Sequence, residues 1–180
     1  ELLPAKYFPQ LKAAGLTNAI GQIDMSPDPP FVKGFNNPKY WGPVMKATRE
    51  AIDACAEYGY KNVICFTGYK EDIPDDVGAK NCVEGFKQVM GDAEKKGVTL
   101  CLEMLNSRVT THPMKGHPGY QGDHTDYCID IIRQIQAVEV GGVEEVALQP
   151  PHLVVHLLPL GPRVHADLGG VQLQLAVARL

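Results

Sequence analysis

Apolar residues form two short, nearly continuous runs in the middle of the chain. They cover residues 62–67 (NVICFT) and 98–105 (VTLCLEML), and each begins shortly after a glycine. Continuous apolar runs of this length are typical of strands that are buried on both faces, as in parallel sheets. We therefore expect two central strands here. Residues 16–25 form a further strand candidate, and residues 1–3 resemble the end of another.

Between these runs, apolar residues recur every three or four positions, a spacing that indicates amphipathic helices. The predicted helices cover residues 4–14, 38–58, 77–96 and 125–135. Gly15, Gly59 and Gly97 follow the first three of them, and glycine is the residue that most often ends a helix. Residues 26–38, rich in proline, glycine and asparagine, are expected to form a loop.

Strand, loop and helix thus alternate about every 35–40 residues, which is the βα rhythm of a parallel sheet. The sequence contains neither a GxGxxG turn nor a P-loop, the motifs of open nucleotide-binding sheets. The loops that follow strands are long and polar, and this asymmetry favours a barrel. A complete (β/α)8 barrel needs roughly 250 residues. We therefore expect an α/β fold that is a partial (β/α)8 TIM barrel.

One carboxylate, Glu103, interrupts the apolar run 98–105. A carboxylate in a buried strand costs free energy unless a metal ion, a cation or hydrogen-bond donors satisfy it. The chain then becomes polar, with Asn106, Arg108, His117 and His124 among prolines and glycines. In α/β folds, functional sites are built at the carboxyl ends of strands. Glu103 is therefore the first candidate for a functional residue.

Three segments around Glu103 resemble one known family. They are CLEMLNSRVTTHPMKGHPGYQGDHTDYCIDII (residues 101–132), FTG (66–68) and DDVGAKNCVEG (75–85). Together they resemble the hydroxypyruvate isomerase-like branch of the xylose isomerase-like TIM barrels. The resemblance covers residues 1–135 and is most specific in 106–126. It implies that Glu1 ends strand two of the barrel and that strands three, four and five follow.

The resemblance also implies a chemistry for Glu103. In that family the glutamate that closes strand five is a ligand of a divalent metal such as Mg²⁺ or Mn²⁺ and acts as acid and base. The implied enzyme is an isomerase of hydroxypyruvate or a related small keto or hydroxy sugar. The family's other ligands come from strands six to eight, and nothing in the sequence matches them. We therefore expect this chain by itself to be inactive and to bind divalent metal weakly.

The chemistry itself supports this role for Glu103. Interconversion of a ketose and an aldose moves a proton between adjacent carbons through an enediolate. Such a reaction needs a metal on the substrate oxygens and a carboxylate placed as a base. The alternative is a structural ion pair between Glu103 and Arg108 or a neighbouring lysine.

Other residues of the loop are candidates for binding substrate. Asn106 and Arg108 could bind substrate oxygens or a carboxylate, or could simply organise the loop through hydrogen bonds. His117 is a candidate substrate contact, although the histidines match no zinc spacing. Gly68 could let a ligand approach the backbone, or could be a turn residue.

Three rival functions remain open from the sequence. A ketose 3-epimerase of the same fold would use the same glutamate on a longer sugar. An endonuclease of the same fold would act on abasic DNA, but it would need several histidine ligands and a basic face. The third rival is a barrel fragment without catalytic activity.

The net charge and the cysteines indicate which partners and which cellular compartment to expect. The net charge is −4, and the chain has no basic tract, so we expect a small-molecule substrate and neither nucleic acid nor a membrane as partner. The five cysteines lack CxxC spacing and are expected to be buried thiols in a cytoplasmic protein. The sequence starts at Glu1 and therefore leaves open whether a targeting signal precedes it. It also leaves the oligomeric state open.

The last 45 residues differ in composition from the rest of the chain. Residues 136–180 use only Ala, Val, Leu, Gly, Pro, Glu, Gln, His, Asp and Arg, whereas residues 1–135 use all twenty types. The types that are present have codons beginning with G or C. We therefore expect 136–180 to be an aberrant tail, read from GC-rich DNA in another frame, rather than part of the fold.

Overall fold

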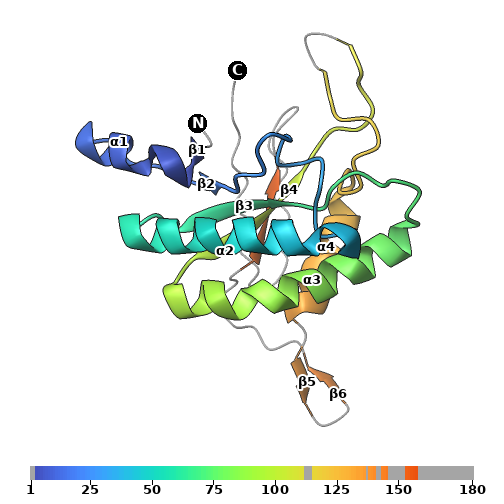
Figure 1. The fold of residues 1–180 in the computed structure, drawn as a ribbon. Coiled ribbons are helices and arrows are strands. Elements are labelled where there is room, and N and C mark those ends of the chain that lie inside the picture. The colour runs from blue at the N-terminus through green and yellow to red at the C-terminus, as the bar shows by residue number, and fades with distance from the viewer. Residues whose placement is uncertain (1–2, 112–114, 137, 141–142, 146–152, 158–180) are drawn as a thin grey trace.

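The computed structural model describes residues 3–111, 115–136, 138–140, 143–145 and 153–157, with side chains in the first two ranges. Its centre is a five-stranded parallel sheet in the order β1-β2-β3-β4-β7 (Figure 1). The strands are β1 (Leu3–Pro4), β2 (Gly21–Gln22), β3 (Asn62–Phe66), β4 (Thr99–Met104) and β7 (Leu153–Leu157).

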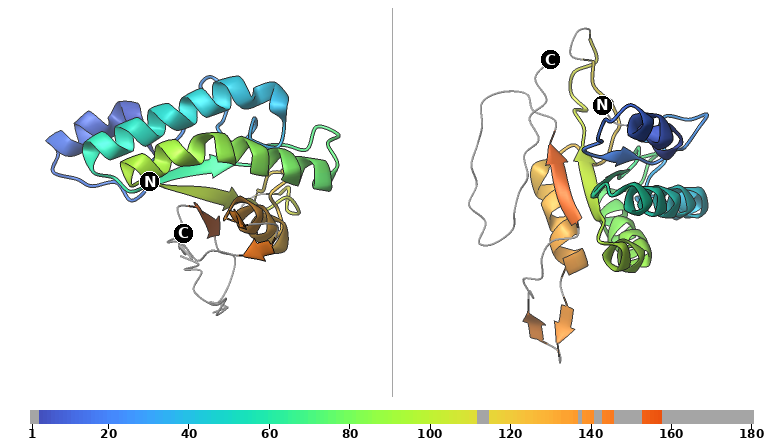
Figure 2. Two further views of the ribbon diagram at one scale, coloured as in Figure 1. Left: turned by 90° about the horizontal axis from the view of Figure 1, so that it is seen from below. Right: turned by 90° about the vertical axis from the view of Figure 1, so that its left-hand side faces the viewer.

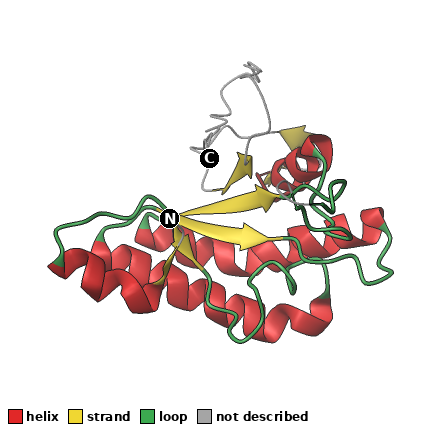
Figure 3. Ribbon diagram, turned by 90° about the horizontal axis from the view of Figure 1, so that it is seen from above, coloured by secondary structure: helices red, strands yellow, loops and turns green. Residues whose placement is uncertain are grey.

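The helices form one layer against this sheet. They are η1 (Ala5–Tyr7), α1 (Phe8–Ala13), η2 (Pro38–Tyr40), α2 (Trp41–Tyr58), α3 (Asp75–Lys96) and α4 (Thr125–Gln136). Helix α2 packs on β3 and on α3, whereas α3 packs on β4 and on α4. Figure 3 shows α2 and α3 side by side along the strands. A doubly wound sheet would carry helices on both faces, so this winding confirms a partial TIM barrel.

The predicted helices and central strands are confirmed to within a few residues. Gly59 and Gly97 end α2 and α3 in the left-handed conformation, with φ of 75° and 62°. Asp75 and Asp76 lie in the first turn of α3, and basic residues lie in its last turn, as the helix dipole favours. All five cysteines are free and buried.

The strand that was expected over residues 16–25 is wrong in its extent, because only Gly21 and Gln22 pair with neighbouring strands. Leu16 is 60% exposed, and the Asn18 side chain donates a hydrogen bond to the Ile20 carbonyl oxygen at 2.9 Å. This local bond competes with strand pairing. A Cβ at Gly21 would lie 2.6 Å from the Cys55 sulfur, so glycine lets β2 approach α2.

The register of β3 with β4 decides which face carries Glu103. Phe66 lies opposite Glu103, and Cys65 lies opposite Leu102. The Cys65 thiol lies near Thr48 of α2 and therefore faces the helices. Side chains alternate along a strand. Phe66 and Glu103 consequently face the opposite side, which is the inside of a barrel.

Two features lie beyond residue 135. Strand β7 runs parallel to β4, as a sixth barrel strand would (Figure 2). Strands β5 (Val138–Val140) and β6 (Val143–Glu145) form a separate antiparallel pair. The sequence predicts no strand or helix after residue 135. The structure differs from this prediction, because β7 pairs with β4. The wider prediction of an aberrant tail stays a prediction, and residues 158–180 lie outside the described part.

Candidate active site

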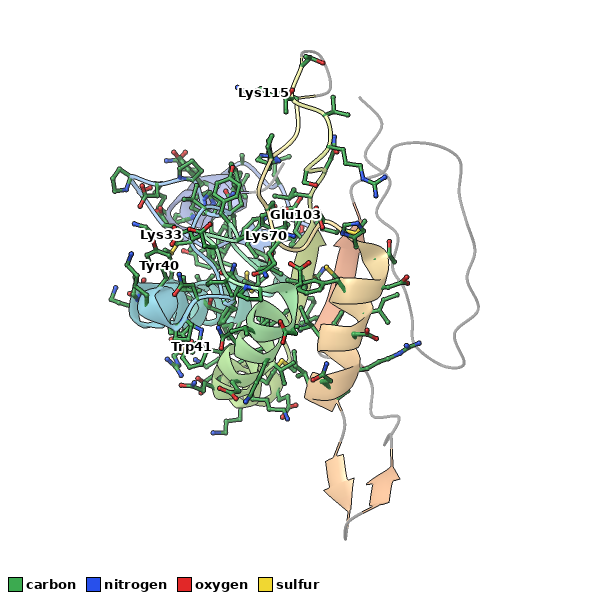
Figure 4. All side chains as sticks on the ribbon, turned by 90° about the vertical axis from the view of Figure 1, so that its right-hand side faces the viewer. Lys33, Tyr40, Trp41, Lys70, Glu103 and Lys115 are labelled. Carbon is green, nitrogen blue, oxygen red and sulfur yellow. The ribbon has the colours of Figure 1, made fainter. Side chains whose placement is uncertain are left out.

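Three loops meet at the carboxyl ends of the strands. They follow β2, β3 and β4, and backbone hydrogen bonds join them. The Asn36 amide donates to the Thr67 carbonyl oxygen at 2.9 Å, and the Gln121 amide donates to the Gly68 carbonyl oxygen at 3.0 Å. In Figure 4, Glu103 lies at the base of the long loop that carries Lys115. Glu103 thus lies at the carboxyl end of β4, where the three loops meet.

The Glu103 side chain is almost completely buried, with 4% of its surface exposed. No side chain of residues 3–111 and 115–136 makes a hydrogen bond or an ion pair with its carboxylate, and burial raises the pKa of Glu103 to about 7. The ion pair with Arg108 that the sequence left open does not form, since Arg108 is exposed. The described residues therefore leave the ionised form of Glu103 uncompensated.

The Tyr120 hydroxyl bridges the two strands beside Glu103. It donates a hydrogen bond to the Glu103 carbonyl oxygen at 2.9 Å and accepts one from the Thr67 amide at 3.0 Å. The ring is fully buried, and burial holds the pKa of Tyr120 well above its usual range. The hydroxyl thus stays protonated and satisfies both backbone groups.

A second set of hydrogen bonds fixes the loop directly after Tyr120. The Gly122 amide donates to the Thr67 hydroxyl at 2.9 Å. The Asn36 side chain donates to the Gln121 side-chain oxygen at 2.7 Å, and both groups are buried. A Cβ at Gly34 would lie 2.3 Å from the Thr67 carbonyl carbon. The loops are therefore packed against one another at backbone distance.

Aromatic rings line the inner face next to Glu103. Phe31 makes edge-to-face contacts with His117, Phe66 and Tyr69, with ring centroids 4.3, 6.3 and 6.2 Å apart. His117 is half-buried, and burial together with Lys115 lowers its pKa. The imidazole is therefore neutral near pH 7 and can donate or accept a hydrogen bond.

The remaining predicted site residues differ in their surroundings. The Asn106 side-chain oxygen accepts a hydrogen bond from the Arg108 amide at 2.9 Å, so this side chain organises the turn. Gly68 has φ of 100°, and a Cβ there would lie 2.7 Å from the Asn36 side-chain oxygen. Protein atoms, rather than open space, therefore surround Gly68. Their roles toward a substrate stay predictions.

His117 and His124, the two histidines whose side chains the structure describes, do not form a ligand set with Glu103. His124 contacts Asp123, which also accepts a hydrogen bond from the Ser107 hydroxyl. His112 lies outside the described residues. Within residues 3–111 and 115–136, no three His, Cys, Asp or Glu side chains lie close enough to hold a metal ion. Glu103, buried and uncompensated, fits the role of one ligand, and this part of the chain supplies no complete centre.

Several residues of the site were not predicted from the sequence. Phe31, Asn36, Tyr120 and Gln121 read as ordinary loop residues, because their partners lie far away along the chain. The hydrogen bond between Thr67 and Tyr120 spans 53 positions, and that between Asn36 and Gln121 spans 85. The one available signal was the presence of a tyrosine and a glutamine in the segment that carries the family resemblance.

Comparison with known families decides the identity of the fold. Residues 10–143 match the model of the xylose isomerase-like TIM barrel. The chain belongs to the xylose isomerase-like TIM barrel family. A comparison with curated proteins finds no match.

Solved structures agree with this family at the level of the fold. An AP endonuclease of family 2 from Brucella melitensis shares 14% identity over 85% of this chain, with a TM-score of 0.59. A D-psicose 3-epimerase from Clostridium cellulolyticum shares 15% over 85%, with a TM-score of 0.55. A D-tagatose 3-epimerase-like protein shares 15% over 85%, with a TM-score of 0.53. The chain covers 52%, 48% and 49% of these proteins, which is about half of their length.

The helices were also compared with the requirements of a membrane span. Among the described residues, no helix combines the length and apolar character needed to cross a bilayer.

Proposed function

We propose that this xylose isomerase-like chain supplies the strand-five part of the active site of a divalent-metal-dependent isomerase. The proposed substrate is hydroxypyruvate or a related small keto or hydroxy sugar. The observation that carries the proposal is Glu103, a buried carboxylate at the carboxyl end of β4 that no side chain of residues 3–111 and 115–136 pairs. The family match and the resemblance of the 106–126 loop support it.

The proposed role of Glu103 is proton transfer. A carboxylate whose pKa lies near 7 is suited to both accept and return a proton at neutral pH. It would take a proton from the hydroxymethyl carbon of hydroxypyruvate and return it to the neighbouring carbonyl carbon, while the proton of the hydroxyl group moves to the former carbonyl oxygen. The product is the isomeric hydroxy aldehyde, and no atom is gained or lost. The inner face around Phe66 and Phe31 would exclude water from the reaction.

A divalent cation would hold the two substrate oxygens and stabilise negative charge that develops on them. Glu103 would be one of its ligands, and the remaining ligands lie outside the described residues. A neighbouring cation also lowers the free-energy cost of an ionised buried carboxylate.

The first prediction tests Glu103 directly. In a full-length barrel that carries residues 1–135, Glu103→Gln should lower kcat for hydroxypyruvate isomerisation by about 1,000-fold or more, because it removes the base and a charged ligand. The measurement is a steady-state assay of the aldehyde product. Glu94→Gln in the exposed last turn of α3 is the matched control and should leave kcat unchanged.

A loss of less than about tenfold in Glu103→Gln would contradict the assignment. Circular dichroism of both variants checks that the fold is retained, since Gln keeps the size of the side chain. The kcat of Glu103→Gln is compared with that of Glu94→Gln, because both variants lose one negative charge.

The second candidate is a ketose 3-epimerase. It is favoured by the structural neighbours, which include a D-psicose 3-epimerase and a D-tagatose 3-epimerase-like protein. The same assay with D-psicose in place of hydroxypyruvate separates the two candidates. Turnover of the ketohexose at a higher kcat/KM than hydroxypyruvate would replace the first proposal with the second. Cleavage of an abasic oligonucleotide would replace both.

A further inference from the structure

The ladder between β3 and β4 stops at the residue pair that includes the candidate acid. Its last pair is Phe66 opposite Glu103. At this end of a parallel ladder the Thr67 amide faces the Glu103 carbonyl oxygen. The Tyr120 hydroxyl makes a hydrogen bond with both groups, at 3.0 Å from the amide nitrogen and 2.9 Å from the carbonyl oxygen. One phenol thus binds both strands at the point where the ladder ends.

We propose that Tyr120 is a positioning residue: its hydroxyl, bonded to both the Thr67 amide and the Glu103 carbonyl oxygen, holds the carboxyl ends of β3 and β4 together and so keeps the Glu103 side chain buried. The functional meaning of this placement rests on the function proposed for Glu103, but the geometry does not.

Neighbouring hydrogen bonds hold Tyr120 in place. The two residues that follow the tyrosine are tied to the end of β3, because the Gln121 amide donates to the Gly68 carbonyl oxygen and the Gly122 amide donates to the Thr67 hydroxyl. The Leu105 amide returns a hydrogen bond to the Gly122 carbonyl oxygen at 3.2 Å. The loop is therefore fixed directly after Tyr120, and β4 is fixed just after Glu103.

A comparison within the chain separates this role from simple packing. Tyr127 in α4 also carries a buried hydroxyl, but that oxygen has no hydrogen-bond partner among the described residues. Removing it takes away the same atom without breaking a bond. Removing the Tyr120 hydroxyl leaves one buried amide and one buried carbonyl unpaired, and water must enter to satisfy them. Entry of water at this point opens the strand ends beside Glu103.

The test compares Tyr120→Phe with Tyr127→Phe in the full 180-residue chain. Carboxyl groups are labelled with a carbodiimide and glycinamide at pH 5, and the labelling rate of Glu103 is measured by mass spectrometry relative to exposed Glu94. We expect the Glu103 rate to rise at least fivefold in Tyr120→Phe and to stay unchanged in Tyr127→Phe. Exposure admits the reagent and also favours the ionised carboxylate, so a rise in the labelling rate reports entry of solvent at the strand ends beside Glu103.

Alkylation of Cys82 reports whether the whole fold has opened. This thiol is fully buried in α3 and should stay as slow as in the parent chain. An unchanged Glu103 rate in Tyr120→Phe would overturn the proposal. A parallel rise of Glu103 labelling and Cys82 alkylation would also overturn it, because Tyr120 would then stabilise the fold as a whole. Neither readout needs metal or substrate, so the result is independent of the activity assay for Glu103.

Discussion

At the scale of single residues, Glu103 combines two properties that seldom occur together. Its backbone is part of a regular parallel ladder, whereas its carboxylate is buried without a partner among the described side chains. Buried carboxylates in proteins are normally paired or hydrogen-bonded. The residue therefore stores an unfavourable free energy that depends on its charge, and this dependence can be measured.

The pH dependence of stability follows from the pKa of Glu103. Burial raises its pKa from 4.5 to about 7. Because the folded pKa lies above the unfolded value, stability is fully present below about 4.5 and is lost as the pH rises through 7. Between pH 5 and pH 8, the free energy of unfolding of the parent chain should fall by about 2–3 kcal/mol relative to Glu103→Gln.

Urea unfolding of both proteins at the two pH values measures this difference. All other titrating groups are shared, so their contributions cancel in the comparison. Equal pH dependence of the two proteins would mean that Glu103 is paired or exposed in solution.

Glu103 could be predicted from the sequence because a single carboxylate in an apolar run is a local signal. Tyr120 could not, because its role arises from groups on two strands that come together only in the folded protein. The Asn106 side chain shows the reverse case, since its hydrogen bond to the Arg108 amide is local and was one of the two expected roles. Long-range partnership is therefore the part of the site that sequence patterns miss.

At the scale of elements, helix α3 has one side that packs against a loop of the site and one side that faces solvent. Its glycines lie in the same helical conformation but differ in their surroundings. A Cβ at Gly91 would meet no atom within 4 Å, whereas a Cβ at Gly78 would lie 2.3 Å from the Gln121 side chain. Gly78 thus lets the loop after β4 dock on the start of α3, while Gly91 lies on the exposed side.

A matched pair of substitutions tests this difference. Gly91→Ala should raise the free energy of unfolding by about 0.5–1 kcal/mol, because alanine loses less backbone entropy in a helix. Gly78→Ala should lower it by about 2 kcal/mol or more, because the added methyl displaces Gln121 and breaks its bond with Asn36. Thermal and urea unfolding measure both values. A stabilising Gly78→Ala would show that Gln121 can move without cost.

The elements themselves differed in how well the sequence predicted them. Strands β3 and β4 and helices α2 and α3 have strong periodicity and clear glycine ends, and their bounds were close to those predicted. Strand β2 is two residues long and lies next to a turn held by Asn18, so its apolar pattern overstated its length. Strand β7 has no periodicity that predicts it, and its pairing depends on the neighbouring edge of β4.

At the scale of the whole molecule, the described residues form part of a barrel whose carboxyl edge is joined by bonds between distant segments. The Asn36 side chain connects the loop after β2 with Gln121 in the loop after β4, across 85 positions. It also donates to the Tyr69 carbonyl oxygen at 2.7 Å in the loop between them. One side chain therefore joins all three loops.

This junction has a consequence for the order of folding. Closing a long segment costs entropy before the contact repays it. The bond between Asn36 and Gln121 can therefore form only after both βα units have docked, and it should be absent from the folding transition state. Asn36→Ala should accordingly increase the unfolding rate while leaving the folding rate nearly unchanged, in stopped-flow chevron measurements.

Ile64→Val in β3 provides the contrast, because Ile64 lies in the pairing of β3 with β4, which we expect to form early. It should slow folding more than it speeds unfolding. If Asn36→Ala slowed folding instead, the loops would be assembling before the sheet. The carboxyl edge that holds Glu103 would then be the nucleus of the domain, rather than the last part of it to become ordered.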